Sequence, residues 1–113
     1  GLKGRWATCP TTEAGLFRLL LNPAVTGTPT THATVAAVIA GFGQDPRWQR
    51  VTDDATLAEP LVNPTVLMGH QQVTDLWLVN LAARHSLVLA TFDAAIPTWL
   101  APADRRHVHV IPQ

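Results

Sequence analysis

Short apolar runs typical of strands alternate along this chain with longer segments whose apolar residues recur at helical spacing. We expect strands over 5–9, 47–52, 87–91 and 107–111. We expect helices over 11–21, 31–42, 55–61, 72–84 and 94–100. Strands that alternate with helices usually pair in parallel, because each helix carries the chain back to the start of the next strand. The order of segments therefore predicts an α/β fold with a parallel sheet.

Proline, glycine and asparagine mark where several of these segments end. Pro10 follows the first strand and suits the first turn of a helix. Asn22-Pro23 ends that helix and leads into a polar loop over 26–31. Gly41 marks the end of the next helix. No internal repeat, low-complexity tract or linker interrupts the pattern, so we expect a single domain over 1–113.

Composition limits the classes of protein to which the chain can belong. Its 113 residues include 47% apolar and 14% charged residues, and the formal net charge is zero. This balance is typical of a globular chain with a modest core and not of a disordered one. Neutrality argues against strong non-specific binding of nucleic acid, although it leaves room for a local basic stripe.

The cysteine content and the hydropathy of the chain predict its cellular compartment. Cys9 is the only cysteine, which excludes an intrachain disulfide and is consistent with a reducing compartment. We expect it to be a small buried core residue. No apolar run reaches the roughly 18 residues of a membrane span, and no signal peptide is visible, so the cytoplasm is the expected location. The sequence begins without Met, which suggests a processed, tagged or truncated start.

Three carboxylates stand where expected strands give way to helices. Glu13 follows the first strand, Asp75 lies in the first turn of its own helix, and Asp93 comes just past the strand over 87–91. Parallel sheets bind ligands beyond the carboxyl ends of their strands, so all three are candidates for one site. Clustered carboxylates repel one another and require a cation. Oxygen ligands without His or Cys favour Mg²⁺ or Mn²⁺ over Zn²⁺.

Each carboxylate also has a purely structural explanation. Glu13 and Asp75 would be favoured in the first turn of a helix by the helix macrodipole. Asp93 would serve as the N-cap of the short helix that follows it. Such positions are common for single acids, and the metal-site hypothesis therefore depends on the three acids taken together.

Three stretches of this chain resemble one known family. They read Trp6-Ala-Thr-Cys-Pro-Thr-Thr-Glu-Ala-Gly-Leu-Phe-Arg18, Gly69-His-Gln-Gln-Val-Thr-Asp-Leu-Trp-Leu-Val-Asn-Leu-Ala82 and Leu87-Val-Leu-Ala-Thr-Phe-Asp93. In order and spacing they look like the PIN-domain ribonucleases, and most of all like the VapC toxins of bacterial toxin–antitoxin pairs. The resemblance covers essentially the whole chain, and it implies a three-layer α/β/α fold around a parallel sheet.

The resemblance also implies a catalytic site. Glu13, Asp75 and Asp93 match the second, third and fourth acidic positions of the family's site, and Thr91 matches the small hydroxyl residue near the metal ligands. One or two Mg²⁺ or Mn²⁺ ions held by these acids would activate water for in-line attack on an RNA phosphodiester. The implied activity is that of a metal-dependent endoribonuclease.

Three further residues are candidates for a supporting role. Thr12 is adjacent to Glu13, and Arg18 lies beyond it on the same helix, where it would meet phosphate or pair with a carboxylate. His70 adjoins the Asp75 helix and is a candidate to face RNA. A surface or ion-pair role for Arg18 and a solvated loop role for His70 remain open alternatives.

The chain departs from the family pattern at its start. PIN domains open with an apolar strand that carries the first Asp, whereas this sequence begins at what resembles the second strand. We expect that central strand to come from elsewhere, such as a bound N-terminal fragment or a swapped neighbour, because its absence leaves strand edges unpaired. The family implies RNA, an antitoxin of the VapB type and a second copy of the chain as partners. The alternative is an inactive PIN remnant that binds antitoxin or dimerises.

The remaining motifs are weaker. No Gly-rich phosphate loop, Ser-His-Asp signature or Cys-based zinc motif is present in the sequence. His107 and His109 alternate on the last expected strand, where we expect edge positions rather than a metal site. We expect core or interface roles for the tryptophans, which are Trp6, Trp48, Trp77 and Trp99.

Overall fold

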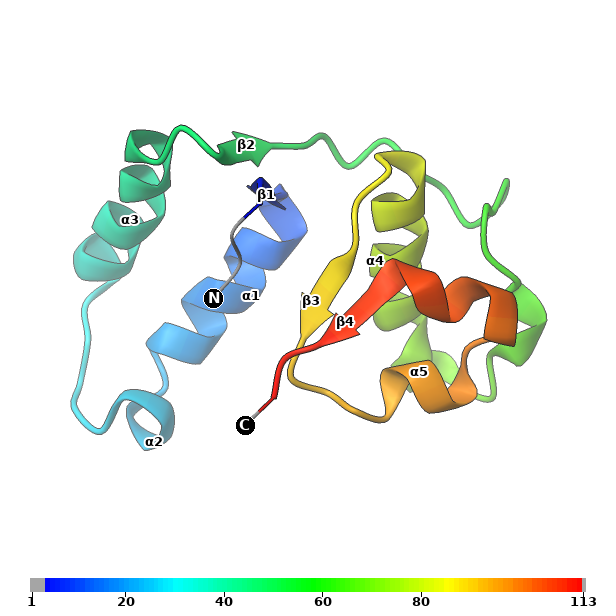
Figure 1. The fold of residues 1–113 in the computed structure, drawn as a ribbon. Helices are drawn as coiled ribbons and strands as arrows, with labels where there is room; N and C mark the ends of the chain where they lie inside the picture. The colour runs from blue at the N-terminus through cyan, green and yellow to red at the C-terminus, as the bar shows by residue number, and fades with distance from the viewer. Residues whose placement is uncertain (1–3, 113) are drawn as a thin grey trace. The chain divides into compact units, whose positions relative to one another are not determined.

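The chain divides into two compact units, Gly1–Asp53 and Asp54–Gln113. A computed structural model describes residues 4–112 (Figure 1). We call the two parts the N-terminal unit and the C-terminal unit. Each unit combines helices with one pair of short parallel strands. The predicted mixture of helices with parallel strands is therefore confirmed.

In the N-terminal unit, two strands lie at the two ends of the described segment and pair in parallel. The elements are β1 (Trp6–Thr8), α1 (Pro10–Leu20), α2 (Pro23–Thr26), α3 (His32–Ala40), η1 (Gly41–Gln44) and β2 (Trp48–Arg50). The register sets Trp6 opposite Trp48 and Thr8 opposite Arg50. Because side chains alternate across a strand, these four side chains share one face of the ladder. The expected strands and long helices of this unit are confirmed, with ends that differ by a few residues.

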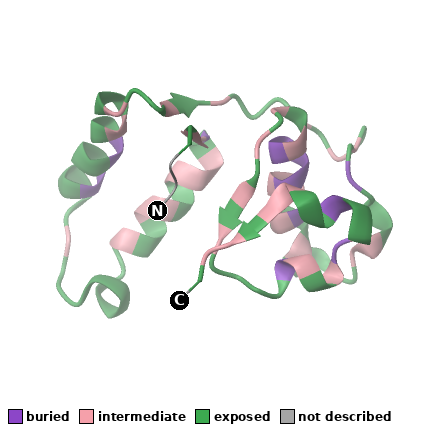
Figure 2. Cartoon of the chain, in the orientation of Figure 1, coloured by how far each residue is buried: buried purple, intermediate pink, exposed green. Residues whose placement is uncertain are grey.

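The core of the N-terminal unit is small. Cys9, Val35 and Ile39 are its buried apolar residues, whereas α1 buries none of its residues (Figure 2). The prediction that Cys9 is a buried, unpaired thiol is confirmed. Trp6 packs edge-on against Phe42, with ring centroids 5.0 Å apart, so aromatic contacts supply much of the packing beside the β1–β2 pair.

A short helix, α2, lies between α1 and the polar loop, where the sequence pattern predicted no helix. Asn22 ends α1 as predicted, and its side-chain oxygen then accepts a hydrogen bond from the backbone N–H of Ala24 at 3.0 Å. Pro23 occupies the first position of α2, which suits its fixed φ. Gly27 ends α2 with a φ of 81°, a left-handed conformation that glycine adopts without strain.

In the C-terminal unit, one long helix packs against a second parallel strand pair (Figure 1). The elements are η2 (Pro64–Val66), η3 (His70–Gln72), α4 (Val73–Arg84), β3 (Leu89–Thr91), α5 (Ile96–Trp99), η4 (Pro102–His107) and β4 (Val108–Val110). The ladder sets Leu89 opposite Val108 and Thr91 opposite Val110. The predicted helix over 72–84 and the two predicted strands of this half are confirmed, each strand being shorter than expected.

The core of the C-terminal unit forms around α4. Leu76 and Val79 are fully buried, and Figure 2 shows buried residues along one part of this helix. The buried cluster consists of Val62, Leu76, Val79, Ile96 and Leu100. Trp99 is packed against this cluster, in agreement with the core role expected for it. Burial of several large aliphatic side chains is the main stabilising contribution in this unit.

The predicted helix over 55–61 is wrong. The segment lacks helical hydrogen bonding, because side chains of α4 bond to its backbone instead. Trp77 Nε1 donates to the Ala55 carbonyl at 3.0 Å, and Asn80 Nδ2 donates to the Thr56 carbonyl at 3.3 Å. Asn80 Oδ1 accepts from the Leu61 N–H at 2.7 Å. These tertiary bonds replace the helical ladder that apolar spacing had suggested.

Among residues 4–112, no helix combines the length and apolar character that crossing a membrane requires.

We predict that Asn80→Ala destabilises the chain by about 1–3 kcal/mol, because the buried Asn80 side chain bonds to the Leu61 N–H and the Thr56 carbonyl and both bonds are lost. Urea unfolding followed by circular dichroism measures the change. Gln71→Ala, at an exposed position of η3, is the control and should have little effect. Equal stabilities for the Asn80 and Gln71 variants would show that the side-chain bonds do not hold the 55–61 segment.

Candidate functional site

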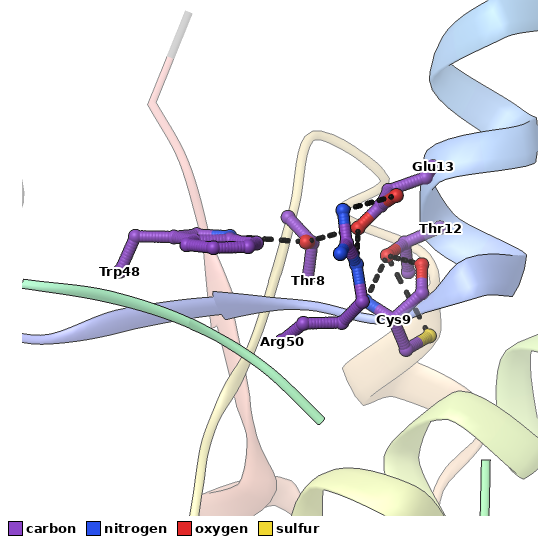
Figure 3. Close-up of polar contacts among 6 residues, drawn as sticks. All are labelled: Thr8, Cys9, Thr12, Glu13, Trp48 and Arg50. Atoms are coloured by element: carbon purple, nitrogen blue, oxygen red, sulfur yellow. Dashed lines mark hydrogen bonds and ion pairs between the residues drawn. The ribbon is translucent and has the colours of Figure 1, made fainter. Parts of the chain in front are cut away.

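Glu13 lies in the first turn of α1, directly after β1, and its carboxylate is fully engaged by neighbours (Figure 3). Arg50 Nε donates to Oε2 at 2.9 Å, and Arg50 Nη2 donates to Oε1 at 3.1 Å. Thr8 Oγ1 donates to Oε2 at 2.6 Å. Both carboxylate oxygens of Glu13 thus have protein donors, and the guanidinium holds them in a bidentate arrangement.

The partners of Glu13 come from the shared face of the β1–β2 ladder. Thr8 and Arg50 are opposite one another in the register, so both reach the helix that begins just beyond β1. Trp48 Nε1 donates to Thr8 Oγ1 at 3.1 Å, which orients the Thr8 proton toward Glu13. The Arg50 guanidinium hydrogen bonds, partly offset by burial, lower the pKa of Glu13. Glu13 is therefore ionised at neutral pH.

Asp75 stands in contrast to Glu13. It lies in the first turn of α4, and among residues 4–112 its carboxylate has no hydrogen bond or ion pair with another side chain. Burial raises the pKa of Asp75, and the nearby charge of Asp93 raises it further. Asp75 is thus a partly desolvated carboxylate under the influence of a second one, and no Lys or Arg of residues 4–112 forms an ion pair with either.

Asp93 follows β3, and its surroundings fit both a capping role and a metal-ligand role. The Asp93 N–H donates to Thr91 Oγ1 at 3.1 Å, and Asp93 Oδ1 accepts from the Ala95 N–H at 2.9 Å. The acid therefore organises the turn before α5. Its second carboxylate oxygen stays exposed and accepts no described hydrogen bond. Thr91 fixes the backbone that carries Asp93, which is a supporting contact near a candidate ligand.

The structure places the other three candidates in different surroundings. Thr12 Oγ1 accepts from the Cys9 N–H at 2.9 Å and donates to the Cys9 carbonyl at 2.9 Å, so it stabilises the start of α1. Arg18 is exposed on α1, and no described carboxylate pairs with it. His70 is exposed and lines a pocket that residues 68–72 form. Thr12 therefore supports Glu13 indirectly, through the helix that carries it.

Two of the three candidate ligands belong to the C-terminal unit, where the charge of Asp93 raises the pKa of Asp75. Glu13 belongs to the N-terminal unit. Within the described part of the chain, no three His, Cys, Asp or Glu side chains form a metal-binding group. Mg²⁺ usually takes only one or two carboxylates and completes its shell with water and substrate phosphate. The donor chemistry of Asp75 and Asp93 therefore fits this cation.

Sequence patterns missed the partners of Glu13. Thr8, Trp48 and Arg50 carry no recognisable motif, and Arg50 is 37 residues from Glu13 along the chain. One signal was available: Trp48 and Arg50 are alternate residues of an expected strand, so both would lie on one face. The parallel register that sets Arg50 opposite Thr8 required the structure.

Comparison with known proteins identifies the family. The chain is 37% identical over 106 residues to "Ribonuclease VapC38" of Mycobacterium tuberculosis, covering 94% of this chain and 74% of that protein. It is 37% identical over 92 residues to "Ribonuclease VapC39" and 31% identical over 91 residues to "Ribonuclease VapC29" of the same species. It spans 66% and 63% of those two relatives.

The chain belongs to the VapC ribonuclease family. The resemblance inferred from the three motifs is confirmed. No known protein-family model matches the chain, and no solved structure matches it. Membership in the VapC family implies a PIN-type α/β fold, and the short parallel strand pairs of both units agree with it.

We predict that Asp75→Asn raises the melting temperature at pH 7. The folded state raises the pKa of Asp75 above its unfolded value, so the charged carboxylate destabilises the protein once the pH exceeds that value. The gain should shrink as the pH falls toward the ordinary Asp range near 4. Thermal unfolding in EDTA at several pH values measures this, with Asp53→Asn as control. A lower melting temperature for Asp75→Asn at pH 7 would contradict the prediction.

Proposed function

We propose that this protein is a metal-dependent endoribonuclease toxin of the VapC family that hydrolyses RNA phosphodiester bonds. One observation carries the proposal: Asp75 is a partly desolvated carboxylate with no side-chain partner among residues 4–112, and the negative charge of Asp93 acts on it. Desolvated carboxylates without a compensating cation are costly, and a chain keeps them where a ligand supplies the charge. The names of the relatives supply the reaction class, since all three are called ribonucleases.

The proposal assigns roles to the chain's own residues. Asp75 and Asp93 would hold Mg²⁺ or Mn²⁺, and the family resemblance adds Glu13 as a further acidic residue for catalysis. When bound, the ion lowers the pKa of a water molecule and offsets the charge that develops on the phosphate. Thr91 holds the backbone of Asp93 and thus the direction of its free oxygen. Thr12 holds the first turn of α1, which carries Glu13.

The family also indicates the partners that we propose. These are RNA as substrate, a cognate antitoxin of the VapB type that silences the enzyme, and a second copy of the chain in a homodimer. We propose a PIN-like three-layer α/β/α arrangement for the folded enzyme and the cytoplasm as its location. Arg18 is a candidate RNA contact, because it is exposed and has no described carboxylate partner. His70 is a second candidate, exposed beside the start of α4.

We predict that Asp93→Asn lowers the rate of RNA cleavage by about a hundredfold or more. Even indirect partners of metal ligands are worth roughly 10–100-fold, and loss of a ligand charge should cost at least as much. Cleavage of a mixed tRNA and rRNA pool is followed on gels with Mg²⁺ and with EDTA. Glu59→Gln, an exposed acid of the same unit, should cut like the unchanged protein.

The alternative is a catalytically inactive PIN remnant that binds antitoxin or dimerises. The same experiment separates the two functions. Cleavage that requires the metal and is lost in Asp93→Asn supports the enzyme. A folded protein that cuts no RNA with either metal, while Asp93→Asn behaves identically, contradicts the nuclease and favours the remnant.

A further inference from the structure

We propose that Arg50 is a contact for an RNA backbone phosphate, presented to the substrate by Glu13 and Trp48. The inference rests on the proposed ribonuclease function, because it names how the same site holds its substrate. It depends on contacts within the N-terminal unit alone.

The Arg50 guanidinium has donors left over after it binds Glu13. A guanidinium carries five N–H donors. Nε and Nη2 each donate to the Glu13 carboxylate, which leaves both hydrogens of Nη1 and one of Nη2. The Arg50 side chain is 48% exposed, whereas that of Glu13 is only 14% exposed. In this ion pair, Arg50 and its remaining N–H donors are therefore more accessible to a ligand than the Glu13 carboxylate is.

Arg50 is also held in place before any ligand arrives. Two parallel hydrogen bonds fix the guanidinium plane against Glu13 (Figure 3). On the same strand, Arg50 lies over the Trp48 ring, 5.1 Å from its centroid. Thr8 in turn links Trp48 to Glu13. A side chain fixed in this way loses little further freedom on binding, and preorganised donors bind more tightly for that reason.

The chain contains another ion-paired arginine that lacks these features. Arg84 forms an ion pair with Asp54, with Nε 3.3 Å from Oδ2, and its side chain is 51% exposed. Asp54 is shared with His85, whose Nε2 lies 2.7 Å from Oδ1. Arg84 has no described aromatic ring beneath it and no bidentate carboxylate. It matches Arg50 in charge, exposure and pairing, and so it is a suitable control.

Phosphate is the ligand that this geometry favours. The planar fork of arginine suits the oxygens of phosphate, and anchoring by a carboxylate leaves the outer edge of the fork free. The anchor is the acid that we propose for the catalytic site, so a bound phosphodiester at that acid would lie within reach of Arg50. An acidic segment of a protein partner offers similar oxygens and is tested below as the competing ligand.

The experiment measures binding of a fluorescently labelled single-stranded RNA in EDTA, where no metal-dependent cutting occurs. We expect Arg50→Gln to weaken binding roughly tenfold, and to reduce the slope of log affinity against log salt by about 0.7, the contribution of one phosphate contact. Arg84→Gln should bind like the unchanged protein. Melting temperatures of both variants check that the fold is intact.

Two further variants separate phosphate contact from a merely structural role. Arg50→Lys keeps the charge without the fork, so it should keep the salt slope and bind with intermediate affinity. Glu13→Gln removes the negative charge beside Arg50 but keeps an amide oxygen that can accept from the guanidinium, so RNA binding in EDTA should be retained while cleavage with Mg²⁺ is lost. A structural role alone predicts weaker binding for Glu13→Gln as well.

Each outcome decides the inference. Unchanged affinity and slope in Arg50→Gln, with RNA cleavage by the unchanged protein, overturn the Arg50 contact and leave the ribonuclease standing. Equal losses in Arg50→Gln and Arg84→Gln show a general charge effect and also overturn the contact. If Arg50→Gln weakens binding of a fluorescently labelled acidic peptide, measured in the same way, but not binding of RNA, Arg50 contacts a protein ligand and the RNA contact is overturned. If the unchanged protein neither binds nor cuts RNA, the proposed function and the contact both fail.

Discussion

The candidate site depends on one constraint: the negative charge of carboxylates near the starts of helices must be balanced by a partner. Glu13 and Asp75 lie in partly desolvated positions, where an ionised carboxylate needs a partner. The two units meet this requirement differently. Arg50 and Thr8 complete the shell of Glu13 within the N-terminal unit. In the C-terminal unit, Asp75 receives no such partner, and its neighbour Asp93 adds a second negative charge. A bound cation would supply the positive charge that Asp75 does not receive from the described residues.

The placement of these acids follows from the alternation of strands and helices. A strand that ends at Thr8 or Thr91 delivers the next residues to the edge of its ladder, and the following helix or turn begins there. Backbone groups hold the side chains here: the Thr91 hydroxyl accepts from the Asp93 N–H, and the Asp93 carboxylate accepts from the Ala95 N–H. The long helix α4 fixes the position of Asp75, because residues of the same helix such as Leu76 pack into the core. Packing of one face of a helix thus holds a carboxylate of its first turn in place.

Sequence reasoning succeeded where local chemistry decides the structure and failed where distant residues do. The long helices, the strand positions and the junction acids follow from periodicity, proline and capping, all of which are local. The segment over 55–61 has helical spacing, but Trp77 and Asn80 take its backbone groups. The partnership of Glu13 with Arg50 depends on a parallel register between strands 40 residues apart. No pattern in one sequence encodes that register, which is why the most informative contact of the candidate site was not predicted.

The different electrostatic states of the acids suggest a division of labour between them. The Glu13–Arg50 pair is close to neutral, so it attracts a divalent cation less strongly than the pair of Asp75 and Asp93 does. A cation should therefore be held mainly by the two aspartates, whose mutual repulsion it relieves. The neutral pair has a different advantage, since its exposed guanidinium edge offers hydrogen bonds to an anion without the bare negative charge that would repel a phosphate. In our proposal, the carboxylates of one unit attract a cation, and in the other unit a carboxylate orients the Arg50 guanidinium toward a phosphate.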